Sequence, residues 1–183
     1  MNDLKSKSVA IIGGGVIGMS TAFHLAEKGV PEITVIDKGY IGGGSSLQAA
    51  GIVTSLEWNE TAIRARLKTL DNFERFSRIL EGYSFHQVGC LNLSSEEDYI
   101  IDKDLRDLQI RLGSKVEVLQ GKKITDRFSD VIAQSNECGV LDLRGGYSEP
   151  HRYVPALQNK IKDMGVQIRE YEEVVGFDLQ GSQ

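Results

Sequence analysis

The stretch that decides the fold is VAIIGGGVIGMSTAFHLAEKGVPEITVID, residues 9–37. Residues 9–12 form a short apolar run, which is typical of a buried parallel strand. A helical pattern follows this run and is stopped by Gly29 and Pro31. Residues 33–36 form a second apolar run. The stretch therefore predicts a strand, a glycine-rich turn, a helix and a second strand.

Three glycines in the turn, Gly13, Gly15 and Gly18, fit the pattern G-x-G-x-x-G. In dinucleotide-binding folds the first makes the tight turn, the second lets the backbone approach a pyrophosphate, and the third lets the helix pack closely on the strand. The helix start offers unpaired N–H groups and a positive dipole end to phosphate oxygens. Asp37 ends the second strand, 24 positions after Gly13, where a carboxylate can accept hydrogen bonds from a ribose. This context predicts a dinucleotide site, and the motif alone does not choose between NAD and FAD.

The segment after Asp37 is KGYIGGGSSLQAAGIVTS, which is rich in small residues. A nicotinamide-binding unit would usually continue quickly into another helix and parallel strand. Here, instead, glycines and serines can bring N–H groups and hydroxyls close to a ligand, and residues 49–51 leave room for a flat ring or a pyrophosphate. A flexible surface loop is the alternative for such a composition. The position directly after the dinucleotide unit favours a ligand-binding segment.

Length and composition exclude several classes of protein. The chain has 183 residues, enough for one ordinary domain with a good core. A formal net charge of -5 and the lack of a basic run argue against a nucleic-acid surface. We find no apolar stretch that could span a membrane and no signal-peptide core in MNDLKSKS. Cys90 and Cys138 are far apart and belong to no metal-ligand pattern, so we expect no metal site and a reducing, cytoplasmic setting.

The middle of the chain predicts further elements. A long helix is expected over residues 59–80, with an apolar stripe that includes Ile63 and Leu70, and Trp58 at its entry is expected in the core. In the block 83–144 we expect short strands and helices, among them a helix capped by a Ser94-x-x-Glu97 box. Strands are expected at 115–119 and 139–143, and a short helix or charged turn at 122–128.

The last part of the chain predicts a return to the first sheet. Pro150 suits the first position of a helix, which Gly165 ends. The apolar residues at 166–168 predict a strand beside the second strand of the opening stretch. Residues 174–179 resemble the first arm of a hairpin, with its turn at residues 180–181.

Several of these motifs resemble one family. GGGVIG, VIDKG and GGGSSLQAAGIV are similar to flavoproteins of the D-amino-acid-oxidase type, which include glycine oxidase, sarcosine oxidase with its beta subunit, and D-amino-acid dehydrogenase. HQVGCLNLSSEED resembles the start of that family's substrate domain, and GGYSEPHRYVPALQNKIKDMGVQI its return to the cofactor domain. The resemblance implies an α/β fold with a Rossmann-like FAD-binding parallel sheet in residues 1–82 and 145–183. An inserted α+β substrate domain would begin in residues 83–144, and both domains would be incomplete.

The resemblance also implies FAD-binding roles at matching positions. The pyrophosphate would lie against the glycine turn and a serine pair, the ribose near an acidic residue and its neighbour, the flavin ring along 50–52, and the adenine near a late valine. These residues are Gly13, Gly14, Gly15, Val16, Ile17, Gly18, Asp37, Lys38, Ser45, Ser46, Ala50, Gly51, Ile52 and Val174. The family more often has glutamate where this chain has Asp37. No catalytic residue is assigned, because the family's carboxylate-holding arginine would lie beyond Gln183.

The leading hypothesis is an FAD-dependent oxidoreductase, present as its N-terminal portion. It would oxidise the C–N bond of a small amine or amino acid, of the glycine, sarcosine or D-amino-acid type, to an imine by hydride transfer to the flavin. The alternative is a non-catalytic FAD-binding subunit or a split-enzyme half that a partner chain completes. The expected protein partners are a complementing C-terminal chain or further copies of this chain in a homo-oligomer. An NAD-dependent dehydrogenase is a third hypothesis, against which the irregular glycine-serine segment argues. We expect the isolated portion to be inactive.

Overall fold

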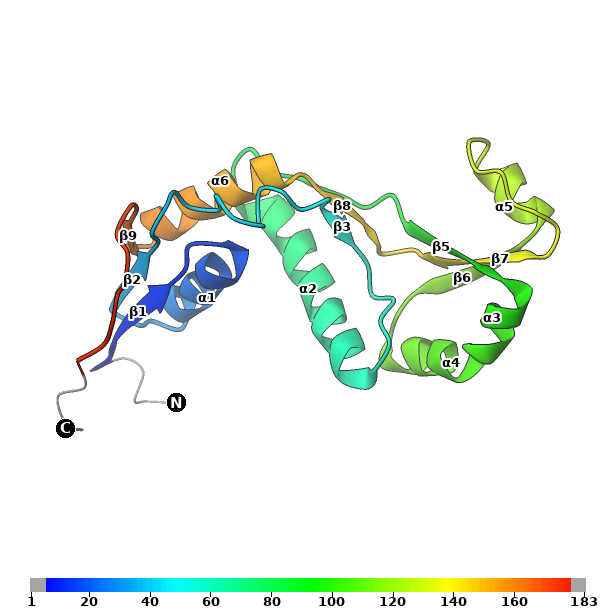
Figure 1. The fold of residues 1–183 in the computed structure, drawn as a ribbon, viewed down its shortest axis with the longest axis horizontal. Coiled ribbons are helices and arrows are strands. Elements are labelled where there is room, and N and C mark those ends of the chain that lie inside the picture. Colours follow the sequence, from blue (N-terminus) through cyan, green and yellow to red (C-terminus); the bar gives the residue numbers. More distant parts are fainter. Residues whose placement is uncertain (1–5, 179–183) are drawn as a thin grey trace. The chain divides into compact units, whose positions relative to one another are not determined.

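The opening stretch folds into the predicted strand, turn, helix and strand. The computed structural model describes residues 6–178, in which β1 spans Ser8–Ile12, α1 Val16–Glu27 and β2 Glu32–Ile36. β1 and β2 pair in parallel, with Val9 opposite Ile33 (Figure 1). Gly29 follows the helix with a φ of +78°, a conformation that glycine adopts readily at a helix end.

β9 (Gln167–Arg169) extends the parallel sheet in the order β1-β2-β9. The prediction of a strand beside the second strand is therefore confirmed, with Val35 opposite Ile168. The helix before it, α6, spans Pro150–Asp163, begins at the proline as predicted and continues through Pro155. α6 packs against α1, and Figure 1 shows the two helices next to the sheet.

The core of this part lies between the sheet and the two helices. Phe23 of α1, Val35 of β2 and Leu157 of α6 are almost completely buried. By contrast, Ile12 of β1 is 54% exposed and alternate residues of the strand are exposed, so the prediction of a buried first strand is wrong. β1 pairs only with β2 among the described strands, and its alternate side chains face away from the helices.

Residues 51–79 and 84–148 form a second compact unit, while 1–50, 80–83 and 149–183 group with the parallel sheet. This division differs from the predicted boundaries mainly in residues 51–79. β3 (Ile52–Val53) pairs with β8 (Gly146–Ser148), and α2 (Glu60–Ile79) packs against β4 (Phe85–His86), so this segment belongs with the later strands. The assignment of cofactor and substrate roles to the two parts stays a prediction.

The second unit contains two antiparallel sheets, ordered β3-β8-β4 and β5-β7-β6. β5 spans Cys90–Ser95, β6 Val116–Gln120 and β7 Glu137–Asp142. The predicted strands at 115–119 and 139–143 are thus present, each shifted by one or two residues. α5 (Lys122–Arg127) lies where the short helix or turn was expected.

The helices of the second unit agree in part with the sequence patterns. α2 buries Ile63, Leu70 and Phe76 on one face, as predicted. The next helical stretch is two helices, α3 (Glu96–Ile101) and α4 (Lys103–Leu112). The predicted cap at Ser94 is wrong by one residue. Ser94 lies in β5 opposite Cys138 of β7, and the Oγ of Ser95 accepts from the N–H of Asp98 at 3.1 Å.

Two further expectations concern exposure and the end of the chain. Trp58 is 79% exposed, so its predicted core position is wrong. Residues 174–178 form no strand, which does not support the expected hairpin arm, and the predicted turn at 180–181 lies outside the described residues. Within residues 6–178, no helix combines the length and apolarity needed to cross a bilayer.

Candidate functional site

The glycine-rich turn joins β1 to α1 in a geometry that requires two of its glycines. Gly13 has a φ of +105°, and its N–H donates to the carbonyl of Ile36 in β2 at 2.8 Å. A Cβ on Gly18 would lie 1.9 Å from the carbonyl oxygen of Gly13, which no real structure tolerates. Gly13 therefore makes the turn, and Gly18 lets α1 start directly against it.

Gly15 differs from Gly18 in what surrounds it. A Cβ on Gly15 would meet only the Oγ of Ser46, at 3.1 Å, so the protein itself leaves this side of the turn nearly open. Gly15 has an ordinary φ of -72°. Neither the fold nor the backbone conformation demands a glycine here, which is the pattern expected where a ligand approaches the main chain.

Asp37 ties the end of β2 to the glycine-rich turn. Its Oδ2 accepts from the N–H of Gly14 at 2.7 Å, and its Oδ1 accepts from the N–H of Gly39 at 2.8 Å. Each carboxylate oxygen can accept a second hydrogen bond, and the side chain is only half buried. Asp37 is therefore held in place by backbone donors while it keeps acceptor capacity for a hydroxyl group.

The glycine-serine segment folds back over the start of α1. The N–H of Gly42 donates to the carbonyl of Gly14 at 3.0 Å, and the N–H of Val16 donates to the Oγ of Ser46 at 3.0 Å. The N-cap residue, Gly15, offers no side-chain acceptor, and the first turn of α1 contains no acidic residue. No carboxylate of α1 itself neutralises the positive end of the helix dipole, and the nearby carboxylate of Asp37 binds Gly14, one residue before the N-cap. The first turn of α1 can therefore face an anion beside Asp37.

The residues that follow β9, 170–174, form a short strap that supports the glycine-serine segment. The sequence patterns did not indicate this strap. The Oε1 of Glu170 accepts from the N–H of Ile41 at 2.8 Å, and the N–H of Glu172 donates to the carbonyl of Asp37 at 3.0 Å. The sequence feature that could have indicated Glu170 is its position directly after a predicted parallel strand, at the edge where parallel sheets bind ligands. The strap holds the 37–41 turn against the sheet.

The position of α1 is further stabilised by α6. The buried Tyr153 of α6 packs its ring 5.1 Å from that of Tyr83. Burial raises the pKa of Tyr153 to about 12, and a hydrogen bond with Ser20 of α1 opposes this shift. The neutral phenol thus fixes α6 against the helix whose start forms the candidate site.

The structure brings together only some of the predicted site residues. Gly13 to Gly18, Asp37 and Ser46 meet around the start of α1. Ile17 is 82% exposed there, and Lys38, Ser45 and Ala50 are exposed as well. Val174 is half buried in the strap region, whereas Gly51 and Ile52 fall in the second unit, where Ile52 pairs with Tyr147.

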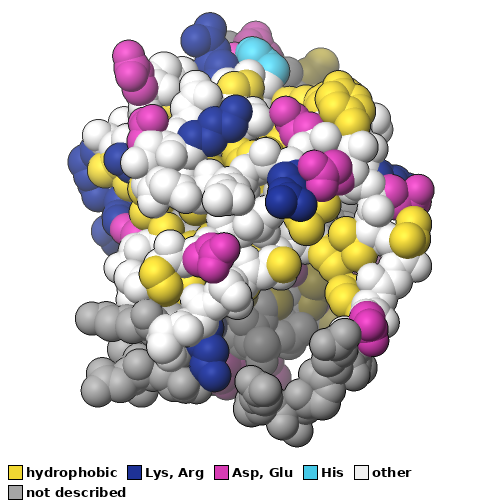
Figure 2. All heavy atoms as spheres, turned by 90° about the vertical axis from the view of Figure 1, so that its left-hand side faces the viewer, with side chains coloured by type: hydrophobic (Ala, Val, Ile, Leu, Met, Phe, Trp, Pro, Cys, Tyr) yellow, Lys and Arg dark blue, Asp and Glu magenta, His cyan; other side chains and the backbone are white. Residues whose placement is uncertain are grey.

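The charge around this part of the molecule is mixed. Figure 2 shows basic and acidic side chains interspersed on the face that it draws, without a continuous basic area among the described residues. No group of three or more histidine, cysteine, aspartate or glutamate side chains in residues 6–178 could hold a metal ion. The arrangement can bind a diphosphate through backbone N–H groups and a ribose through Asp37.

Comparison with known proteins agrees with this geometry. The model of the family described as "DAO: FAD dependent oxidoreductase" matches residues 8–183. Sarcosine oxidase subunit beta from an Arthrobacter species is 28% identical over 182 residues, which cover 94% of this chain and 45% of the relative. The formaldehyde-forming 4-methylaminobutanoate oxidase of Paenarthrobacter nicotinovorans is 28% identical over 169 residues, which cover 87% of this chain and 20% of the relative.

A similar fold occurs among solved structures. L-Proline dehydrogenase from P. horikoshii superposes with a TM-score of 0.86 at 25% identity, covering 96% of this chain and 47% of that structure. The chain therefore spans between about a fifth and a half of the length of these relatives.

Proposed function

Because the chain belongs to the DAO family of FAD-dependent oxidoreductases, we propose that its parallel-sheet unit binds the adenosine diphosphate part of FAD. The observation that carries this proposal is the start of α1: a first turn without acidic residues, next to the open side of Gly15 and the carboxylate of Asp37. A dinucleotide needs a diphosphate site and a ribose acceptor at this spacing.

Within this site each group of residues takes one part of the nucleotide. The diphosphate lies against Gly13 to Gly18, including Gly14, Val16 and Ile17, with Ser45 and Ser46 beside it. Asp37 accepts from the ribose hydroxyls, with Lys38 adjacent. The adenine lies near Val174, and the flavin ring passes residues 50–52. Support for this assignment comes from the matching family motifs and from the hydrogen bonds that join Gly14, Val16, Asp37 and Ser46.

For the whole protein we propose oxidation of the C–N bond of a small amine or amino acid to an imine. Bound FAD supplies the acceptor for the hydride in such chemistry. Support comes from the family and from relatives whose names state an amine or amino-acid substrate, sarcosine and 4-methylaminobutanoate. The described residues contribute nucleotide binding and the opening part of a substrate domain, and we assign no catalytic residue among them.

Titration with two nucleotides tests the cofactor. The chain is titrated with FAD and with NAD, and binding is followed by flavin fluorescence and by calorimetry. We expect FAD to bind more tightly than NAD. Tighter binding of NAD would contradict the proposal and favour the NAD-dependent dehydrogenase.

A second candidate is an FAD-binding subunit or half that a partner chain completes. The outer edge of β1 pairs with no described strand, and Ile12 is exposed on it, so the sheet offers a surface on which another chain can pair. One relative is itself named as a subunit. Mixing the chain with a candidate second-half polypeptide should then increase flavin binding and produce turnover with sarcosine or glycine. Unchanged flavin binding after mixing would count against it.

A further inference from the structure

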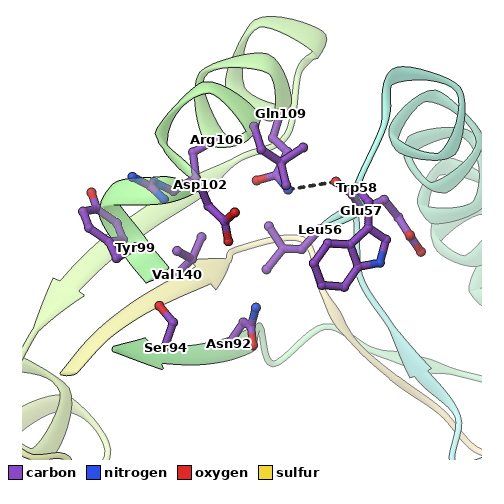
Figure 3. A pocket seen from close by; sticks show the side chains of 11 residues that line it. Leu56, Glu57, Trp58, Asn92, Ser94, Tyr99, Asp102, Arg106, Gln109 and Val140 are labelled. Carbon is purple, nitrogen blue, oxygen red and sulfur yellow. Dashed lines mark hydrogen bonds between the residues drawn. The ribbon is translucent and has the colours of Figure 1, made fainter. Parts of the chain in front are cut away.

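The second unit contains a cavity that the nucleotide site does not use. It measures about 80 Å³ and lies between α3 and α4 on one side and β5, β7 and residues 56–58 on the other (Figure 3). This space is several times the roughly 10 to 15 Å³ that a single water needs. The volume fits a small metabolite and is too small for a nucleotide.

One wall of the cavity is a buried cation. Arg106 of α4 is only 8% exposed, and its guanidinium stacks on the ring of Tyr99, 3.6 Å from the ring centre. Among the described residues it forms no ion pair with a carboxylate, and no side-chain acceptor engages its N–H groups. Gln109 Oε1 and Ser114 Oγ are the fully buried side-chain polar atoms without a partner among the described residues, so the Arg106 nitrogens are accessible from the cavity. Stacking on the ring leaves their N–H groups free to donate. The cavity therefore favours an anionic group beside Arg106.

Another part of the wall needs a hydrogen-bond donor. Gln109, 5% exposed, donates from Nε2 to the carbonyl of Glu57 at 3.1 Å, and its Oε1 is buried without a partner. The side chain of Asp102 caps neither neighbouring helix, and Figure 3 shows its carboxylate and the Gln109 oxygen directed into the space. A neutral acceptor and a carboxylate facing the same space favour a positively charged N–H donor.

We propose that this cavity binds a small zwitterionic amino acid of about the size of glycine. The ligand carboxylate pairs with Arg106, and its ammonium group donates to Oε1 of Gln109 and to the carboxylate of Asp102. This arrangement pairs the guanidinium with a carboxylate and gives the buried oxygen of Gln109 a donor at the same time. None of these residues belongs to the proposed nucleotide site, so the ligand can be tested without flavin.

Trp58 provides a local readout, because it lines the cavity and is the single tryptophan of the chain. The full chain is titrated with glycine, acetate or methylammonium while Trp58 emission is recorded. We expect a saturable change with glycine and a dissociation constant of about 1 mM, a magnitude reasonable for so small a ligand. Acetate and methylammonium, which each carry one of the two charges, should bind at least about tenfold more weakly. No saturable change with glycine, or equal affinity for acetate or methylammonium, would overturn the proposal.

Three variants locate the binding site. Arg106→Gln should abolish the response to glycine and acetate. Asp102→Asn, at an exposed position whose side chain makes no capping hydrogen bond, should keep acetate binding but remove the preference for glycine. Arg111→Gln, on the exposed face of the same helix α4, is the matched control and should respond as the unaltered chain does. An unchanged glycine response in either Arg106→Gln or Asp102→Asn would contradict the assignment, and circular dichroism verifies that each variant is folded.

Discussion

The proposed nucleotide site and the cavity of the second unit are built from different parts of the chain. Around the start of α1 the site is made of backbone and small side chains, and the N–H groups of Gly14 and Val16 hold Asp37 and Ser46 in place there. Around the cavity the charges and acceptors belong to long side chains, Arg106 and Gln109. The nucleotide site should therefore lose affinity when a substitution adds side-chain atoms. The cavity should lose affinity when a substitution removes a charge.

The largest effect is expected where a glycine of the first unit packs against backbone. Gly18→Ala places a Cβ 1.9 Å from the carbonyl oxygen of Gly13, so α1 must move away from the turn. We expect the free energy of unfolding to fall by at least about 4 kcal/mol, together with loss of FAD binding. Urea unfolding, monitored by circular dichroism, measures the change in the free energy of unfolding. Gly176→Ala, whose Cβ would meet nothing within 4 Å, is the control. Equal stability of the two variants would show that the close approach is not required.

In the second unit, the corresponding large effect on stability is expected at the buried carboxylate of Asp142. Asp142 accepts four hydrogen bonds, from Ser55 N–H at 2.6 Å, Ser55 Oγ at 2.8 Å, Thr54 Oγ1 at 2.9 Å and Arg144 N–H at 3.0 Å. In Asp142→Asn the amide NH2 faces hydrogen-bond donors in either orientation of the side chain. This mismatch should lower the free energy of unfolding by about 3 kcal/mol. Urea unfolding followed by Trp58 emission measures this loss. The exposed Asp126→Asn should change stability by less than about 0.5 kcal/mol.

Alkaline pH should reveal the buried phenol that joins α6 to α1. The pKa of Tyr153 is raised from 10.0 to about 12 in the folded chain, so the folded state holds its proton where the unfolded state releases it. Its contribution to stability is complete below pH 10 and is lost as pH rises toward about 12. The loss should total about 2 to 3 kcal/mol. Unfolding measured at several alkaline pH values should show this slope, which Tyr153→Phe should reduce and Tyr171→Phe, at an exposed position, should not.

A smaller effect is expected at Ser46, whose side chain contacts the first residue of α1. Ser46→Ala removes the acceptor for the N–H of Val16, which should lower stability by about 1 kcal/mol without flavin. Because backbone donors remain for the diphosphate, FAD affinity should fall by less than about tenfold. Thermal unfolding and flavin titration measure the two quantities. A complete loss of FAD binding would mean that a side chain, and not the backbone, dominates the site.

The features that could be predicted from sequence are those that short-range chemistry determines. Gly13, Gly18 and Gly29 mark a turn, a close approach and a helix end, and each takes the conformation or packing that its spacing indicated. The parallel position of β9 followed from an apolar run after a well-defined helix. These features depend on residues that are close in sequence or on a single strand pairing.

The features that could not be predicted depend on contacts between distant segments. Asp142 meets Ser55 across 87 positions, and Glu170 meets Ile41 across 129. The exposure of Trp58 and Ile12 depends on which elements cover them, which periodicity does not specify. The cavity of the second unit arises from side chains of four separate segments, so no local pattern indicated Arg106 or Gln109.

The most direct test of the nucleotide site is the FAD affinity of Gly15→Val. Its Cβ would meet only the Oγ of Ser46, at 3.1 Å, so the variant should fold, as circular dichroism can verify. If the diphosphate lies against bare backbone, the side chain occupies its place and FAD binding should weaken by about 100-fold or more, equivalent to about 3 kcal/mol. A folded Gly15→Val variant that binds FAD as tightly as the unaltered chain would contradict the account.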